Sequence, residues 1–276
     1  MIVRWVFACA ATMAPAAAQA SAWLYPNESV GAKVYVSRFE GEGYFDDQGE
    51  VVRFPFQGVG TYDSIFGEIS LAYPERWNFW ANAPLKTATY ADNFGQKQVR
   101  AIGDLWMFAK RQMTDQPLVV SVIPAVKAPT APKSIYGNRA WELGLSVPVI
   151  LQTKGSPLQL QSELGLYAPL KSNASAYAYA QVGAEAYFAV WRGTLIVRLG
   201  AQTERRFALH ADPTPVVEWY WIEPYAGVKY RFPGWWEAEV GIGKMTSGRS
   251  AGTGTDVGFG ITKLFSFAKD PVAGSN

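Results

Sequence analysis

The chain has 276 residues, of which 17% are charged and 14% aromatic, and its formal net charge is +2. This aromatic content excludes a disordered chain, and the near-neutral charge gives no basic patch that would suggest a nucleic-acid partner. Apolar runs of about 20 residues, which membrane helices need, are missing beyond the N-terminus, so a β-rich chain remains.

Residues 1–20 are predicted to be a secretory signal peptide rather than part of the fold. A short, positively charged start precedes an apolar run over residues 5–14, and Ala18-Gln19-Ala20 matches the A-x-A cleavage pattern. The apolar run is too short to remain as a membrane span. Cys9, the single cysteine, lies within this segment, so the remaining domain, residues 21–276, is expected to have no disulfide or thiolate chemistry.

After Gly31 the dominant pattern is an alternation of apolar and polar residues with a period of two, which predicts β-strands. Most of these strands have about ten or more residues, the length that spans a bilayer when tilted, whereas strands of soluble sheets have about five or six. In chain order the predicted strands are residues 29–39, 62–73, 77–87, 99–112, 117–128, 140–152, 157–168, 176–190, 194–206, 218–231, 235–246 and 255–267.

The connections between these strands alternate in length. Tight turns are predicted at 74–76, 114–116, 153–156, 191–193 and 232–234, and longer links at 40–61, 88–98, 129–139, 169–175, 207–217 and 247–254. Outer-membrane barrels have short periplasmic turns and longer outer loops, whereas a soluble sandwich has no reason to alternate. The sequence therefore predicts an all-β fold, an antiparallel up-and-down transmembrane β-barrel of about 12 strands with both chain ends on the periplasmic side.

Each predicted strand has an apolar face and a polar face. In 157–167 four leucines share one face, while Gln159, Gln161 and Glu163 share the other. We expect the apolar face to contact lipid and the polar face to line the lumen. By this parity the charged residues predicted to line the lumen are Glu68, Asp104, Lys110, Lys127, Glu142, Glu163, Glu185, Arg198, Glu204, Glu223, Lys229, Arg231 and Glu239.

Two roles are open for these lumen charges. Buried charges must pair, so they can fill the barrel as an ionic network, which is the favoured interpretation. They can also line a pore that selects solutes by charge and size. Carboxylates outnumber basic groups among them, which indicates tolerance for cations if water passes.

Aromatic residues gather beside the short turns, where an interfacial girdle of an outer-membrane barrel lies. The core of a soluble sandwich would instead place its aromatic residues in mid-strand. The predicted girdle consists of Tyr73, Trp77, Trp191, Tyr230, Phe232, Trp235, Trp236, Phe265 and Phe267. Residues 258–267 resemble the C-terminal signal that the barrel-assembly machinery reads, although residues 268–276 continue beyond it, so this machinery and outer-membrane lipid are the expected partners.

Several short motifs resemble one proteobacterial family. They are VRAIGDLW at 99–106, PLVVSV at 117–122, VKAPT at 126–130, WELGL at 141–145 and AWLYP at 22–26. Together they are similar to the family named for the meta-pathway of phenol degradation. That resemblance implies an outer-membrane β-barrel over residues 23–267, loosely similar to channels for hydrophobic solutes. The resemblance assigns no functional residue of that family to a position in this sequence.

The sequence contains little that could support catalysis. His210, the single histidine, lies in a predicted loop, whereas a serine hydrolase needs a histidine oriented beside its nucleophile. A metal site built from His210 and Asp212 would lack its third and fourth ligands. We therefore predict that the chain is not an enzyme and uses no metal or cofactor.

The longest predicted link, residues 40–61, is rich in acidic and aromatic residues. It could fold inward as a constriction or bind cations or partners outside the cell. A surface hairpin that extends the first two strands, with its turn at 46–49, is slightly favoured. The predicted function is a passive channel or uptake pore for small solutes, aromatic or hydrophobic ones among them. The alternatives are a structural or surface-interaction barrel plugged by its own side chains and, less favoured, an outer-membrane enzyme.

Overall fold

The computed structural model describes residues 25, 28–53, 60–73, 76–92, 95–132, 140–170, 176–207 and 219–266. The predicted signal peptide, His210 and Phe267 lie outside these residues. No helix long and apolar enough to cross a membrane occurs in the described part. The strands are β1 (Ser29–Phe45), β2 (Val51–Arg53), β3 (Gly60–Tyr73), β4 (Trp77–Asp92), β5 (Gly95–Ile102), β6 (Leu105–Gln112), β7 (Leu118–Ala128), β8 (Glu142–Leu151), β9 (Leu158–Pro169), β10 (Ala176–Val190), β11 (Gly193–Phe207), β12 (Trp219–Phe232), β13 (Trp236–Lys244), β14 (Ser247–Arg249) and β15 (Gly252–Ser266).

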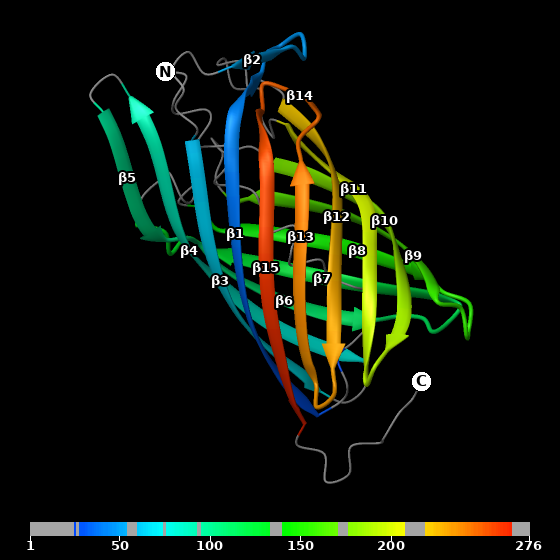
Figure 1. The fold of residues 1–276 in the computed structure, drawn as a ribbon. Helices are drawn as coiled ribbons and strands as arrows, with labels where there is room; N and C mark the ends of the chain where they lie inside the picture. Colours follow the sequence, from blue (N-terminus) through cyan, green and yellow to red (C-terminus); the bar gives the residue numbers. More distant parts are fainter. Residues whose placement is uncertain are drawn as a thin grey trace.

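These strands close into an antiparallel barrel of 12 wall strands (Figure 1). β5 and β6 together form one wall strand beside β4, and β13 and β14 form another beside β12. The first and last wall strands pair with each other, from Ser29 beside Ser266 to Tyr44 beside Gly252. Closure gives each of the 12 wall strands two neighbours, although among the described residues β5 pairs with β4 alone and β2 with β1 alone. The predicted fold class is confirmed.

The expectation of one unbroken strand over residues 99–112 was wrong. It divides at Gly103 and Asp104, where the segment that joins β5 to β6 carries one more residue than β4 between the paired positions Asn82–Trp106 and Leu85–Ile102. Pro84 of β4 lies at this point and has no N–H to donate to the ladder. The resulting bulge turns the Asp104 side chain inward, where its carboxylate accepts a hydrogen bond from the N–H of Ala131.

Several predicted links are partly strand. β1 continues to Phe45 and pairs with β2, and the Asp46 carboxylate caps the turn by accepting hydrogen bonds from the N–H groups of Gln48 and Glu50. This confirms the surface hairpin for residues 40–53. β4 and β5 likewise pair across most of 88–98, and β14 occupies part of 247–254. These links were predicted to be longer than they are, because polar residues continue the hydrogen-bonded strand pairing beyond the apolar wall. In that region an alternation of apolar and polar residues no longer indicates a strand.

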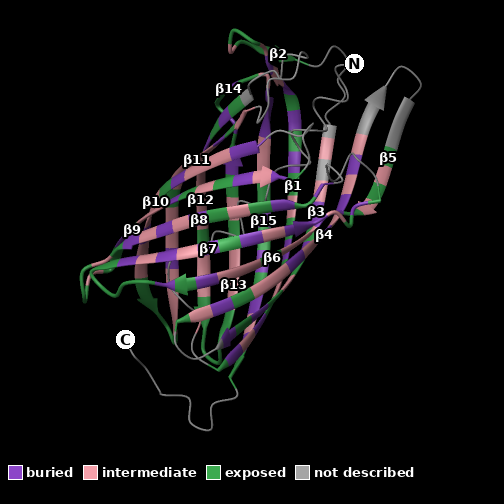
Figure 2. Ribbon diagram, turned by 180° about the vertical axis from the view of Figure 1, so that it is seen from behind, coloured by how far each residue is buried: buried purple, intermediate pink, exposed green. Residues whose placement is uncertain are grey.

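The two faces of the wall differ in polarity, as the alternation predicted. On β9 the four leucines point outward, and Leu164 is 66% exposed, while Gln159 and Glu163 are buried. Figure 2 shows the same alternation of burial along the strands around the barrel. A large exposed apolar band of this kind is what lipid, not water, solvates.

Candidate functional site: the barrel lumen

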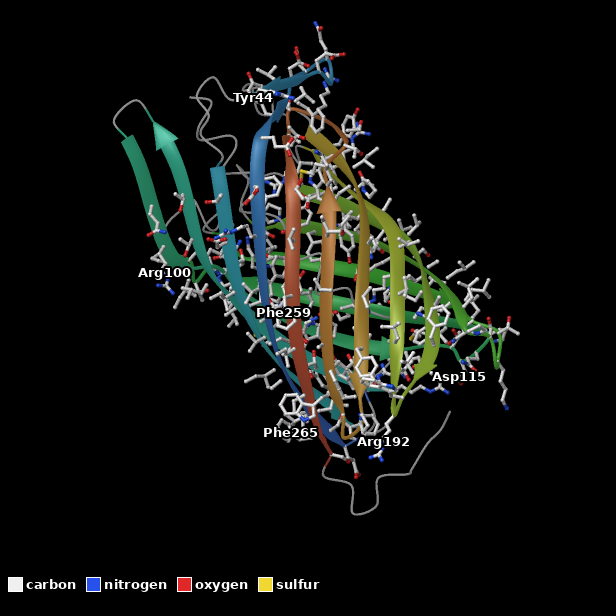
Figure 3. The ribbon with its side chains drawn as sticks, in the orientation of Figure 1. Tyr44, Arg100, Asp115, Arg192, Phe259 and Phe265 are labelled. Atoms are coloured by element: carbon white, nitrogen blue, oxygen red, sulfur yellow. The ribbon has the colours of Figure 1, made fainter. Side chains whose placement is uncertain are left out.

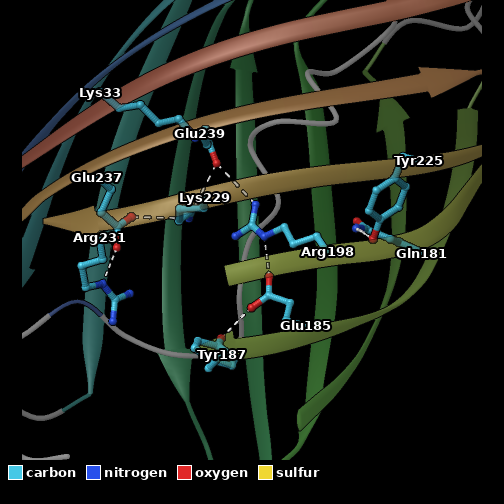
Figure 4. A network of polar contacts seen from close by, with 10 residues as sticks. All are labelled: Lys33, Gln181, Glu185, Tyr187, Arg198, Tyr225, Lys229, Arg231, Glu237 and Glu239. Carbon is cyan, nitrogen blue, oxygen red and sulfur yellow. Dashed lines mark hydrogen bonds and ion pairs between the residues drawn. The ribbon is translucent and has the colours of Figure 1, made fainter. Parts of the chain in front are cut away.

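The lower half of the lumen, toward the short turns, contains a branched ion-pair network centred on Glu239 of β13. Its carboxylate lies 2.5 Å from Lys33 Nζ of β1, 3.4 Å from Arg198 Nη1 of β11 and 3.7 Å from Lys229 Nζ of β12. Figure 4 shows these three cations converging on it. Lys33 and Arg198 come from strands that do not pair with β13, so the network ties the wall together across its curvature.

Two branches extend this network toward the rim. Arg198 also pairs with Glu185 at 2.6 Å, and the Tyr187 hydroxyl donates to Glu185. Glu237 accepts from Arg231 at 2.7 Å and lies 3.4 Å from Lys229. Each carboxylate of these branches therefore faces a cation or a donor, as buried charges require.

A second ionic centre lies at the bulge between β5 and β6. Lys127 Nζ of β7 lies 2.5 Å from Glu142 of β8 and 3.3 Å from Asp104, and all three side chains are almost fully buried. The bulge places Asp104 within reach of Lys127, and the β7–β8 register places Glu142 directly opposite it. Farther along the lumen Glu204 pairs with Arg206 at 3.2 Å, and the Tyr179 hydroxyl donates to Glu163.

Aromatic side chains cover the lumen wall from β4 to β10, and we call this set the aromatic belt. The register makes much of it one row, in which Trp80, Phe108, Ala125, Gly144, Tyr167 and Tyr177 lie beside one another on successive strands. Because Ala125 and Gly144 are small, rings from β6 and β9 meet above them, with Trp106 and Tyr167 5.4 Å apart between ring centroids. The belt consists of Trp80, Trp106, Phe108, Tyr167, Tyr177 and Tyr179.

The opposite wall is bare where three glycines lie side by side. Gly227 of β12, Gly241 of β13 and Gly258 of β15 are direct register partners whose missing side chains would point inward. A cavity of about 60 Å³ lies over Gly227 and Gly241 of this row, while the Tyr35 side chain covers Gly258. It is bounded by Tyr35, Arg198, Glu223, Tyr225, Glu239 and Asp256.

The structure places all the charged residues predicted to line the lumen on the inner face of their strands. Arg231 is the most exposed, because it lies at the mouth beside the short turns. Sequence reasoning omitted Lys33, Lys86, Glu237 and Asp256, which share this face. Strand parity could have found them, since each has the same parity as an inward neighbour such as Tyr35, Asn82 or Glu239.

Most of the predicted girdle residues lie on the outer face near the short turns. Trp191 is 99% exposed at its turn, and Lys263 lies over the rings of Trp236 and Phe265 at 5.0 and 5.6 Å. Figure 3 shows Phe265 at the same end as Arg192, opposite Tyr44. Tyr230, Phe232 and Trp235 are also there, Trp77 stacks on Phe79, and nothing is described for the side chain of Tyr73.

No family model matches this sequence, and a search of curated protein sequences finds no match. The fold is similar to that of an outer membrane channel from Pseudomonas putida F1, with a TM-score of 0.68 and 12% identity over 88% of this chain and 97% of that one. The beta domain of the Bordetella autotransporter BrkA has a TM-score of 0.51 and 11% identity over 86% of this chain and 100% of its own.

The translocator domain of the autotransporter NalP from Neisseria meningitidis has a TM-score of 0.50 and 11% identity over 87% of this chain and 90% of its own. These likenesses show the fold, an outer-membrane β-barrel. The resemblance to the phenol-degradation family stays a prediction.

Proposed function

We propose that this chain spans a bacterial outer membrane as a passive channel for small solutes. One observation carries the proposal: a closed barrel whose outer face is apolar encloses a face made of charged and hydrogen-bonding side chains. A wall of this kind separates lipid from a polar interior, which is how porin-type barrels conduct. The fold that it shares with an outer membrane channel supports the same function.

The aromatic belt supports a preference for solutes that carry an aromatic ring. The belt presents several rings along one side of the lumen, and Lys110 and Lys127 lie over Trp80 and Trp106. Planar solutes can stack on such rings while cations nearby hold water and polar groups. The rival function, a structural barrel plugged by its own ion pairs, is favoured by the density of the Glu239 network. The proposal includes no catalysis.

Conductance in planar lipid bilayers tests the channel. We expect the purified, folded protein to give discrete current steps, and heat-denatured protein from the same preparation to give none. Benzylammonium should block the current at lower concentration than methylammonium, because both carry one positive charge but only the first can stack on the belt. Trp80→Leu should reduce this difference. A folded barrel that inserts without any current would contradict the channel and favour the plugged barrel.

A further inference from the structure

The cavity over the glycine row holds two carboxylates that the ion-pair networks do not use. Glu223 is only 4% exposed, and one of its oxygens accepts a hydrogen bond from Gln202 at 3.0 Å. Its other oxygen, Oε1, has no hydrogen-bond partner among the described residues. The carboxylate of Asp256, which lines the same cavity, makes no hydrogen bond or ion pair with any described residue.

The cations nearest this cavity are already engaged. Arg198 is held by Glu185 at 2.6 Å and by Glu239 at 3.4 Å, on the side of the cavity toward the short turns. Lys33 and Lys229 are likewise paired with Glu239. Neither Glu223 nor Asp256 forms an ion pair with these cations, so an ammonium group that enters the cavity finds two carboxylates that can accept its hydrogen bonds.

The walls of the cavity determine which cation suits it. The phenol rings of Tyr35 and Tyr225 border it, and aromatic faces attract organic cations. No group of three or more His, Cys, Asp or Glu that could hold a metal ion occurs in the part of the chain that the structure describes. The glycine floor leaves room for a small alkyl group beside the backbone.

We propose that this cavity binds the ammonium group of a small organic amine, with Glu223 and Asp256 as the carboxylate acceptors and the two tyrosine rings at its sides. This inference rests on the proposed channel, because the cavity would then be a binding site along the path that the solute takes. It names the class of solute, a primary amine, that this path favours.

Isothermal titration calorimetry with propylammonium chloride on the full-length protein in detergent tests the proposal. We expect saturable binding to one site in the wild type. Glu223→Gln and Asp256→Asn should each weaken binding at least tenfold, because each replaces one of the two carboxylates that face the ligand. Asp63→Asn is the matched control, because Asp63 pairs with Arg38 on the outer face of the wall, away from the cavity. This variant should bind propylammonium as tightly as the wild type does.

Gly241→Ala tests the cavity without changing any charge. A Cβ at this position would meet only the carbonyl oxygen of Ala226, at 3.5 Å, so the barrel should fold while the methyl group occupies the cavity floor. We expect it to weaken binding at least fivefold. Unchanged affinity in all three variants would overturn the proposal, as would sodium or calcium chloride binding as tightly as propylammonium. Binding of propylammonium by a protein that gives no current would contradict only the proposed channel. A current from a protein that does not bind propylammonium would contradict only the proposed amine site.

Discussion

Lys127→Met is expected to destabilise the barrel by about 3–5 kcal/mol, the cost of removing one partner from a buried ion pair. Lys127 is 5% exposed and lies 2.5 Å from Glu142 and 3.3 Å from Asp104. Methionine keeps the volume of the side chain but leaves both carboxylates without this cation. Equilibrium unfolding in urea, followed by tryptophan fluorescence in lipid vesicles, measures the loss.

Two controls separate charge from packing in this experiment. Lys154→Met changes an exposed lysine in the short turn after β8 and should alter stability by less than about 0.5 kcal/mol. The triple variant Asp104→Asn, Lys127→Met, Glu142→Gln removes all three charges and should regain most of the loss. If Lys127→Met unfolds at the wild-type urea concentration, the ion pairs of Lys127 contribute nothing to stability and the expectation is contradicted.

Leu164→Arg is expected to cost about 2–4 kcal/mol when the protein is folded into a bilayer. Leu164 lies near the middle of β9 on the outer face, where hydrocarbon is expected to surround the wall. An arginine there must leave water for lipid, whereas in a water-exposed wall it would cost almost nothing. Urea unfolding in vesicles of a single phospholipid gives the free energy.

Leu118→Arg is the matched control, because it makes the same substitution on the outer face at the end of β7 beside a short turn. Its cost should be about 0–1 kcal/mol, the range for positions near the membrane interface. Equal costs at both positions would contradict the assignment of the outer face to lipid.

Strand number, strand faces and closure could be predicted because they depend on local periodicity. A strand with one face in lipid must alternate, and the leucines of β9 opposite Gln159 and Glu163 do so regardless of their neighbours. The break at Gly103 could not be seen this way, because it follows from Pro84 on another strand. The extensions of β1 and β4 were missed because they rise above the apolar wall.

The ion pairs in the lumen could not be predicted from the alternation of apolar and polar residues, for a different reason. Arg198 reaches Glu239 over Gly227, which lies between them on β12, and Lys33 reaches the same carboxylate over β15. Such contacts depend on the register of three strands and on a small residue in the middle one. Parity identified which charges face inward, but only the register and the packing show that Glu223 and Asp256 both lie beside Gly243.

Thiol accessibility at two adjacent residues of β1 tests the central claim, a water-filled lumen inside a lipid-facing wall. Val36 points outward, while Ser37 points inward beside Gly258. Cys9, the single cysteine of the sequence, lies in the predicted signal peptide, and Cys9→Ser makes the introduced thiol the only one whether or not that segment is removed. The membrane-impermeant trimethylammonium methanethiosulfonate should modify Ser37→Cys in vesicles at least tenfold faster than Val36→Cys. Arg192→Cys, in a short turn, is the reactive control for protein inserted with that side accessible. Modification of both β1 positions at equal rates would contradict the lipid-facing wall, and no modification of Ser37→Cys would contradict the open lumen.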